Sequence, residues 1–133
     1  MTKFLVIVLS LYGAFYYASK HYQFDDTLVY AKKHPEASWA PAVDYYVGLV
    51  YYQRAEYPKA QGAFTQLLGD YGATNYYGVK ALPIAEDSAE YDRDWDQARQ
   101  WNKDYIDNYP DGRDIEVMRK RLELVNYQHG NGQ

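Results

Sequence analysis

The sequence predicts an all-α protein, a short stack of antiparallel helix pairs preceded by an N-terminal hydrophobic helix. Three observations lead to this prediction. An apolar run opens the chain, apolar residues then recur every three or four positions in several segments, and the segment that begins at Tyr57 is repeated from Trp95. Steps of three and four residues mark one face of an α-helix, and a period of about 34 to 40 residues is typical of stacked helix pairs.

Length and composition narrow the number of domains, the class of partner and the kinds of site that the chain can have. The chain has 133 residues, enough for one domain with a single core. Its net charge of −4 argues against a nucleic-acid partner. Cysteine is absent, which excludes disulfides, thiolate metal sites and thiol catalysis. The 17 tyrosines favour interfaces as well as cores, because their rings are apolar and their hydroxyls polar.

The N-terminal segment, residues 1–22, has the character of a membrane-directed helix. A nearly unbroken apolar run from Phe4 to Ala18 follows Lys3. As a helix, this run is about 22 Å long, whereas the hydrocarbon core of a bilayer is about 30 Å thick. Extension of the helix to Tyr22 reduces this difference in length. We therefore predict a hydrophobic signal-anchor helix over residues 1–22, which contacts the membrane through residues 4–22.

A cleaved signal peptide is the alternative for this segment. Cleavage after Ala14 would place Tyr12 at the −3 position, where a small residue is normally required. Cleavage after Ala18 would place Tyr16 there. A short charged N-terminal flank is typical of a cytoplasmic N-terminus, so we expect a membrane-anchored protein whose domain is periplasmic or extracellular. Lysines on both sides of the run leave a domain on the cytoplasmic side as the alternative.

The clearest helix signal begins at Tyr57. Pro58 suits the first turn of a helix, and Gly72 suits its end. The apolar residues between them lie on one helical stripe, namely Tyr57, Ala60, Ala63, Phe64, Leu67, Leu68 and Tyr71. The same stripe recurs later in the chain, with Trp95 in the place of Tyr57, and consists of Trp95, Ala98, Trp101, Tyr105, Ile106 and Tyr109. "LVYAKKHPEAS", from Leu28, looks like the end of an earlier copy.

The stretch "YYVGLVYYQRAEYPKAQGAF" gives the repeat a family resemblance. Its pattern of Gly48-x-x-Tyr51, Tyr57 and Ala60-x-x-x-Phe64 resembles the tetratricopeptide repeat (TPR). The resemblance implies two helices per repeat, which approach closely at the small residues. The second copy departs from the pattern, and its first helix is interrupted by a proline; the differing positions are Pro83, Glu86, Ala89 and Asn102. The "HPEAS" and "NYPDG" helix ends are most similar to bacterial envelope TPR proteins, such as the outer-membrane assembly lipoprotein, the Tol–Pal coordinator and the anchored Sec-associated protein.

The remaining segments complete a predicted TPR-like domain over residues 23–127, with about two and a half repeats and a capping helix. Phe24 to Lys33 would be the second helix of an incomplete first repeat. The capping helix has one apolar stripe, made of Ile115, Met118, Leu122 and Val125. We expect the tail at residues 128–133 to fray.

The resemblance implies a partner-binding groove lined by the first helix of each repeat. The groove positions carried onto this sequence are Tyr45, Leu49, Tyr52, Asp87, Glu90, Lys120, Leu124 and Tyr127. An aromatic floor flanked by charge suits an extended or helical peptide. The alternative is that these tyrosines pack against neighbouring helices, the N-terminal one included. Trp39, between two prolines, is either a staple that packs on the first repeat or an exposed interface anchor.

The acidic stretch "EDSAEYDRDWD" has part of the pattern of a calcium site. Asp92, Asp94 and Asp96 resemble the start of an EF-hand loop. However, Gln97 stands where that loop needs glycine, and Lys103 stands where it needs glutamate. A solvated connection in which Asp94 caps the next helix is the preferred interpretation, with a docking patch for a basic partner as the alternative.

The residues do not suggest an enzyme. His21, His34 and His129 are scattered, with no second ligand at metal-binding spacing. We expect no catalytic activity, no cofactor and no metal ion. The favoured function is a membrane-tethered TPR adaptor or scaffold that mediates protein–protein interaction in the cell envelope. The alternative is a permanent structural subunit of a membrane complex or surface filament, so a homo-oligomer is compatible with the sequence.

Overall fold

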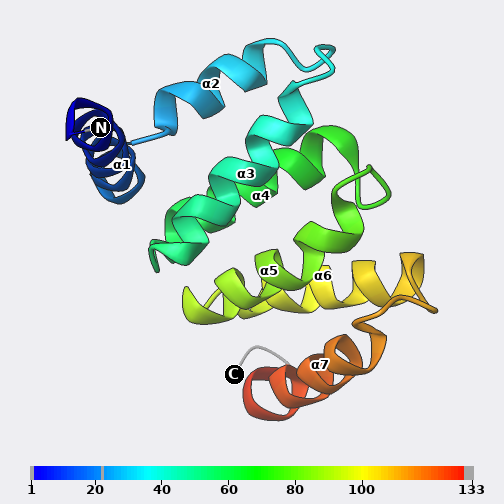
Figure 1. Cartoon of the computed structure of the whole chain (residues 1–133). Coiled ribbons are helices and arrows are strands. Elements are labelled where there is room, and N and C mark those ends of the chain that lie inside the picture. The colour runs from blue at the N-terminus through cyan, green and yellow to red at the C-terminus, as the bar shows by residue number, and fades with distance from the viewer. Residues whose placement is uncertain (1, 22, 131–133) are drawn as a thin grey trace.

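The computed structural model describes residues 2–21 and 23–130, and all regular structure in them is helical (Figure 1). The helices are α1 (Thr2–His21), α2 (Asp25–Lys33), α3 (Ala40–Gln53), α4 (Tyr57–Tyr71), α5 (Gly78–Tyr91), α6 (Trp95–Asn108) and α7 (Ile115–His129). The prediction of an all-α protein is confirmed. From α2 to α7, each helix packs against the next one along the chain. Because short turns join them, successive helices run in opposite directions.

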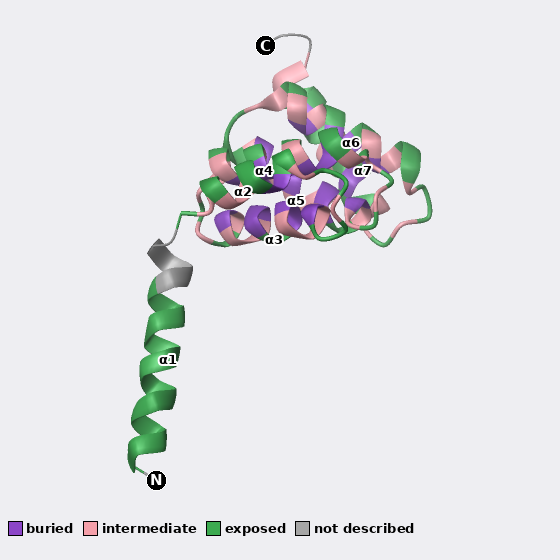
Figure 2. Cartoon of the chain, turned by 90° about the horizontal axis from the view of Figure 1, so that it is seen from above, coloured by how far each residue is buried: buried purple, intermediate pink, exposed green. Residues whose placement is uncertain are grey.

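The helix α1 stands away from the other helices (Figure 2). Its apolar side chains are open to solvent on all sides; Phe4 and Phe15 are each 73% exposed. Within the described residues, no helix combines the length and apolar character needed to cross a bilayer.

The core begins at a close approach between α3 and α4. A side chain at Gly48 would place its Cβ 2.7 Å from Cε1 of Phe64, so only glycine lets the Phe64 ring lie flat against α3. Phe64 is fully buried, together with Ala60, Ala63 and Leu67 from the predicted stripe. The small residues on α4 therefore act as predicted: they allow the two helices to approach closely.

Hydrogen bonds from two other helices hold α2 in place. The Phe24 backbone N–H donates to the Tyr51 hydroxyl at 2.7 Å, and that hydroxyl donates to Asp25 Oδ1 at 2.9 Å. Gln66 on α4 donates to the carbonyl of Leu28 at 2.9 Å and to Asp44 Oδ1 at 2.8 Å. These bonds satisfy polar groups at the edge of the core, where they would otherwise lose hydration without compensation.

The helix α5 continues through Pro83, so the expected interruption is wrong. Proline lacks an N–H and would normally weaken the turn before it. Here α5 is held from both sides, by α4 and α6, and its buried residues Ala81, Leu82, Ala85 and Ala89 are part of the core. The tertiary packing therefore outweighs the local cost of Pro83.

Equivalent positions in the two sequence repeats adopt the same backbone conformation. Ala55 and Arg93 are the two non-glycine residues with positive φ in the described chain, at 59° and 60°. Each sits in the turn between two helices, α3 and α4 or α5 and α6. The Tyr71 hydroxyl donates to the Pro35 carbonyl at 2.9 Å, and the Tyr109 hydroxyl donates to the Ala73 carbonyl at 2.7 Å. The sequence period is therefore also a structural one.

The predicted helix boundaries agree closely with α4, α6 and α7, and Asp94 caps α6 as expected, by accepting from the Gln97 N–H at 3.3 Å. The C-terminal end differs from the expected tail. The helix α7 includes residues 128 and 129, because two contacts hold His129. Its ring stacks on the Trp95 ring with centroids 3.7 Å apart, and its carbonyl accepts a hydrogen bond from Arg99 Nη1 at 2.8 Å. The rest of the expected tail, residues 131–133, lies outside the described residues.

Candidate functional site

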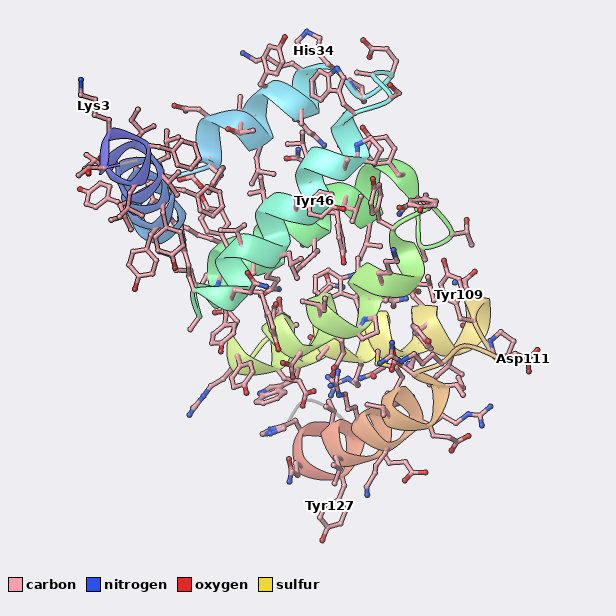
Figure 3. All side chains as sticks on the ribbon, in the orientation of Figure 1. Lys3, His34, Tyr46, Tyr109, Asp111 and Tyr127 are labelled. Carbon is pink, nitrogen blue, oxygen red and sulfur yellow. The ribbon has the colours of Figure 1, made fainter. Side chains whose placement is uncertain are left out.

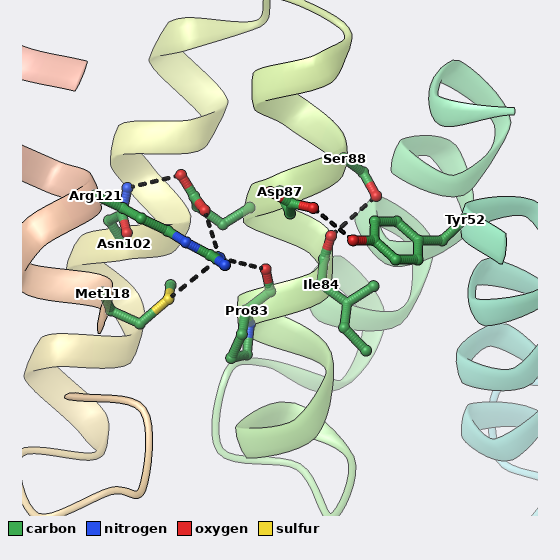
Figure 4. A network of polar contacts seen from close by, with 9 residues as sticks. Tyr52, Pro83, Ile84, Asp87, Ser88, Asn102, Met118 and Arg121 are labelled. Atoms are coloured by element: carbon green, nitrogen blue, oxygen red, sulfur yellow. Dashed lines mark hydrogen bonds and ion pairs between the residues drawn. The ribbon is translucent and has the colours of Figure 1, made fainter. Parts of the chain in front are cut away.

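Tyr52 and Asp87, two predicted groove residues, join α3 to α5. The Tyr52 hydroxyl donates to Asp87 Oδ2 at 2.5 Å (Figure 4). This hydrogen bond, followed by burial, raises the pKa of Tyr52, because ionisation would remove the donated proton and place two negative charges together. The pair therefore links the two helices, and the hydroxyl and the carboxylate already form a hydrogen bond with each other.

Four tyrosines, called the tyrosine cluster below, gather between α3 and the start of α5. Tyr45 stacks on Tyr77 with ring centroids 5.0 Å apart, and Tyr46 and Tyr76 each meet Tyr77 edge to face. Tyr45 is buried, whereas Tyr46 (labelled in Figure 3) and Tyr76 are 57% and 79% exposed. Burial is the main cause that raises the pKa of Tyr45. The cluster offers ring faces and hydroxyl edges to a partner.

A cavity of about 440 Å³, called the groove cavity below, adjoins the tyrosine cluster. Its wall consists mainly of the side chains of Tyr45, Val79, Pro83, Ile84 and Tyr105. Its charged groups are Lys80, Arg113 and Asp114. These residues come from α3, α5, α6 and the turn before α7. The volume lies within the range of about 300–1,000 Å³ that is typical of ligand pockets in proteins.

The turn before α7 wraps around a buried hydroxyl at the cavity wall. Tyr105 is fully buried, and its hydroxyl accepts the Asp114 N–H at 2.9 Å. Gly112 is needed beside it, since a Cβ at that position would lie 2.5 Å from the same hydroxyl oxygen. This contact fixes the position of Arg113 and Asp114 next to α5.

Three carboxylates on α5, Glu86, Asp87 and Glu90, lie within 4.8 Å of one another and are the described residues best placed to hold a cation. Two of the three already have donors. Asp87 accepts from Tyr52 at 2.5 Å, and Glu86 accepts from Arg121 at 3.0 Å. The guanidinium therefore already supplies the positive charge that a metal ion would bring.

Glu86 is the most strongly perturbed group in this network. Its burial raises its pKa to about 9; Glu90 acts in the same direction and Arg121 opposes both. The 3.0 Å contact with Arg121 favours a charged carboxylate. Glu86 is nevertheless fully buried, so we conclude that desolvation prevails and that the pKa lies above its usual range. Asn102 donates to Glu86 Oε1 at 3.1 Å and stabilises either form.

Of the other predicted groove residues, Glu90 lies beside Asp87, whereas those on α7 do not gather around the Tyr52–Asp87 pair. Leu49 is half-buried and packs against the core. On α7, Lys120 is exposed and Leu124 is 48% exposed. Tyr127 is 87% exposed and points away from the helices in Figure 3. The structure thus separates the α7 positions from the aromatic positions on α3.

Trp39 stacks on Tyr30 of α2, with ring centroids 5.5 Å apart and an interplanar angle of 7°. His34 lies beside the pair, 6.1 Å from the Trp39 ring centroid. Trp39 also remains 40% exposed. It therefore packs as the staple interpretation expects, while one face of the indole stays open.

Sequence reasoning missed Lys80 and Arg113, which border the groove cavity, and Tyr46 and Tyr76, which belong to the adjoining tyrosine cluster. The doublet "NYYG" before α5 was a visible signal, because it resembles the aromatic doublet at Tyr45. Lys80 and Arg113 carried no such signal, since the turn before α7 meets α5 only through tertiary packing. The chain has no match among protein-family models, curated proteins or solved structures.

Proposed function

We propose that this protein is a tethered scaffold that binds a segment of another protein on the surface formed by the groove cavity and the tyrosine cluster. The observation that carries the proposal is a cavity of about 440 Å³ beside two tyrosines that are 57% and 79% exposed. Tyrosines are enriched where proteins meet, since a rigid ring buries a large area at a small entropic cost. Binding of this kind needs no chemistry from the protein.

The TPR-like architecture is part of this proposal. It is supported by the equivalent turns at Ala55 and Arg93, and by the equivalent hydroxyl bonds of Tyr71 and Tyr109. Stacked helix pairs present a row of side chains from alternate helices, here α3 and α5, to one partner. The groove cavity lies between residues of α3 and α5, where such a row would begin.

Membrane attachment through α1 is the second part of the proposal. Its apolar side chains, from Phe4 to Tyr17, are exposed on all sides and need an apolar environment. A lipid surface would supply it, with Lys3 near the headgroups and the domain held in the envelope. Contact with other chains would supply it equally well, and this is the basis of the structural-subunit alternative.

One experiment distinguishes the adaptor from the structural subunit. The full chain is extracted from its native membranes in mild detergent, and the mass of the extracted particle is measured. The adaptor predicts a single copy of this chain with less than one equivalent of a partner. Substitution of both Tyr46 and Tyr76 by alanine should remove the partner. Tyr127→Ala, an exposed tyrosine outside the cluster, is the matched control and should retain it.

Two results would overturn the proposal. A stable particle with fixed numbers of several chains, insensitive to the Tyr46 and Tyr76 substitutions, would identify a structural subunit. Recovery of the full chain in the aqueous fraction without detergent would contradict attachment to the membrane through α1.

A further inference from the structure

The groove cavity has an electrostatic character opposite to that of the whole chain. The protein carries a net charge of −4, yet Lys80 and Arg113 both border the cavity. Among the described residues, neither forms an ion pair with a carboxylate; Lys80 instead lies 5.7 Å from the ring centroid of Tyr76. Several exposed cations elsewhere on the surface do have an acidic partner, namely Lys32, Lys59 and Arg119.

The backbone adds to this positive character. Val79 and Lys80 belong to the first turn of α5, and Asp114 is the residue that precedes α7. Helix N-termini carry partial positive charge, and the first turn of α5 contains no acidic residue to neutralise it. The first turn of α5 and two cations therefore border the same cavity, with Asp114 as its one carboxylate. The first turn of α7 contains Glu116, which offsets the partial positive charge of that helix end.

The wall of the cavity, in contrast to its charged border, is mainly apolar. Tyr45, Pro83, Ile84 and Val79 supply apolar surface, and Tyr105 lines the cavity with a hydroxyl that accepts the Asp114 N–H. Tyr105 is fully buried, so its hydroxyl closes the wall and is not offered to an occupant. An occupant that matches this lining needs an apolar part for the wall and an acceptor oxygen, preferably charged, for Lys80 and Arg113.

We propose that the groove cavity binds an extended peptide segment in which acidic side chains lie two positions before and two positions after a large apolar one. In an extended chain, side chains two positions apart point to the same side. The apolar side chain can therefore enter the cavity while the two acidic side chains reach Lys80 and Arg113 at its border. The tyrosine cluster then covers the next part of the peptide. This inference rests on the proposed scaffold function and names the chemistry of its partner.

The test uses the full chain in non-ionic detergent and a rhodamine-labelled peptide of the sequence Gly-Ser-Glu-Ser-Leu-Ser-Glu-Ser-Gly, with both ends blocked. Fluorescence anisotropy should show saturable binding. A peptide with glutamine in place of glutamate should bind at least about tenfold more weakly, as should a peptide with alanine in place of leucine. These two peptides separate the charge requirement from the apolar one.

Charge reversal on the protein tests the site itself. The double variant Lys80→Glu, Arg113→Glu should lose at least about tenfold in affinity for the acidic peptide. The control Lys33→Glu, Lys103→Glu makes the same change in net charge at two exposed residues away from the cavity, and should change affinity by less than about twofold. All four positions are exposed, so both variants should fold.

Three results would overturn the inference. Equal binding of the glutamate and glutamine peptides would remove the charge requirement while leaving the scaffold function intact. Equal losses in the two double variants would show that net charge, and not the cavity, governs binding. Absence of binding by all three peptides, combined with charge-sensitive binding to vesicles of anionic lipid, would assign the two cations to a lipid surface.

Discussion

Gly48 and Phe64 show how one residue sets the distance between two helices. A glycine inside a helix normally costs about 1 kcal/mol relative to alanine. At position 48 this cost is offset, because the missing Cβ leaves room for the buried Phe64 ring. Gly62, in α4, is exposed, and a Cβ added there would have no neighbouring atom within 4 Å, so no such compensation exists at that position.

This contrast gives a matched pair of substitutions. Gly48→Ala should destabilise the protein by about 1–3 kcal/mol, since the Phe64 ring is buried and cannot move away. Gly62→Ala should stabilise it by up to about 1 kcal/mol. Urea denaturation followed by circular dichroism measures both. Equal stability of the two variants would show that α3 and α4 are farther apart than the structure has them.

Glu86 and Asn102 occupy the positions in the second repeat that are equivalent to Gly48 and Phe64 in the first. An apolar contact in one helix pair is thus replaced by a hydrogen bond of 3.1 Å between two fully buried polar side chains in the next. A buried carboxyl group is stable mainly in its neutral form, unless its charge is compensated. Arg121 compensates only in part, and the pKa of Glu86 is raised to about 9 by burial above all.

Stability should therefore depend on pH in a defined window. Because the folded pKa of Glu86 is about 9 and its ordinary value is 4.5, the folded state holds a proton that the unfolded state has lost. Stability from this group falls as pH rises through about 9, by about 2 kcal/mol between pH 7 and pH 9. Glu86→Gln should remove this loss. Asp44, whose pKa is raised to about 6 by burial, titrates below this window.

The measurement is the free energy of unfolding of both proteins in urea at pH 7, 8 and 9. Their difference cancels the titration of all other groups. A parallel pH dependence in the two proteins would mean that the ion pair with Arg121 holds Glu86 charged throughout.

At the scale of elements, α7 is held to the neighbouring helices by polar contacts as much as by apolar ones. Met118 and Val125 are its buried residues. Arg121 reaches across to α5, where its Nη1 donates to the Pro83 carbonyl and to Glu86 Oε2, both at 3.0 Å (Figure 4). A helix that ends the stack has one face without a neighbour, so each contact on its other face has a large share in its stability.

Arg121→Ala should destabilise the protein by about 1–3 kcal/mol, because Glu86 loses its strongest donor inside the core. Hydrogen exchange should accelerate in α7 more than in α3. Arg119→Ala on the same helix removes an exposed pair with Glu116 and should cost less than about 0.5 kcal/mol. An equal effect of the two substitutions would show that α7 is held without the Arg121 contacts.

At the scale of the whole molecule, the chain consists of a packed body and a separate apolar helix. The body extends from α2 to α7, and most of its buried apolar residues form one cluster from Tyr45 to Met118. None of the described side chains of α1, residues 2–17, belongs to that cluster. Its apolar surface therefore adds to interactions with the surroundings and does not add to the stability of the body.

Removal of residues 1–22 should leave the melting temperature of the body within about 2 °C of that of the full chain, because no core contact is lost. The shortened chain should also stay in solution without detergent and fail to bind lipid vesicles. Circular dichroism and vesicle sedimentation check the two parts. A fall in melting temperature of more than about 5 °C would show that α1 packs on the body in solution.

Much of the fold could be predicted because its signals are local. The stripes beginning at Tyr57 and Trp95 correspond to α4 and α6, and Asp94 is the cap that the sequence predicts. The helix α7 continues to His129, just beyond the predicted capping helix, because Trp95, at the start of α6, holds the His129 ring by stacking. That contact joins two helices and leaves no local signal.

The site was less predictable than the fold. Tyr45, Tyr52 and Asp87 were predicted as groove residues through a repeat pattern, and the structure links Tyr52 to Asp87 and places Tyr45 at the cavity. The two cations at the cavity border were not identified, because they come from separate elements that meet only in the folded chain.

The sequence by itself determined most of the helical segments and the apolar face of each, since both depend on neighbours within about four positions. The continuation of α5 through Pro83 is an exception that tertiary packing decided. The tertiary structure alone decided which polar residues meet, as with Glu86, Asn102 and Arg121. It also decided that Lys80 and Arg113 border one cavity. The physical reason is that these contacts depend on the distance and angle between packed helices, and no local pattern encodes that geometry.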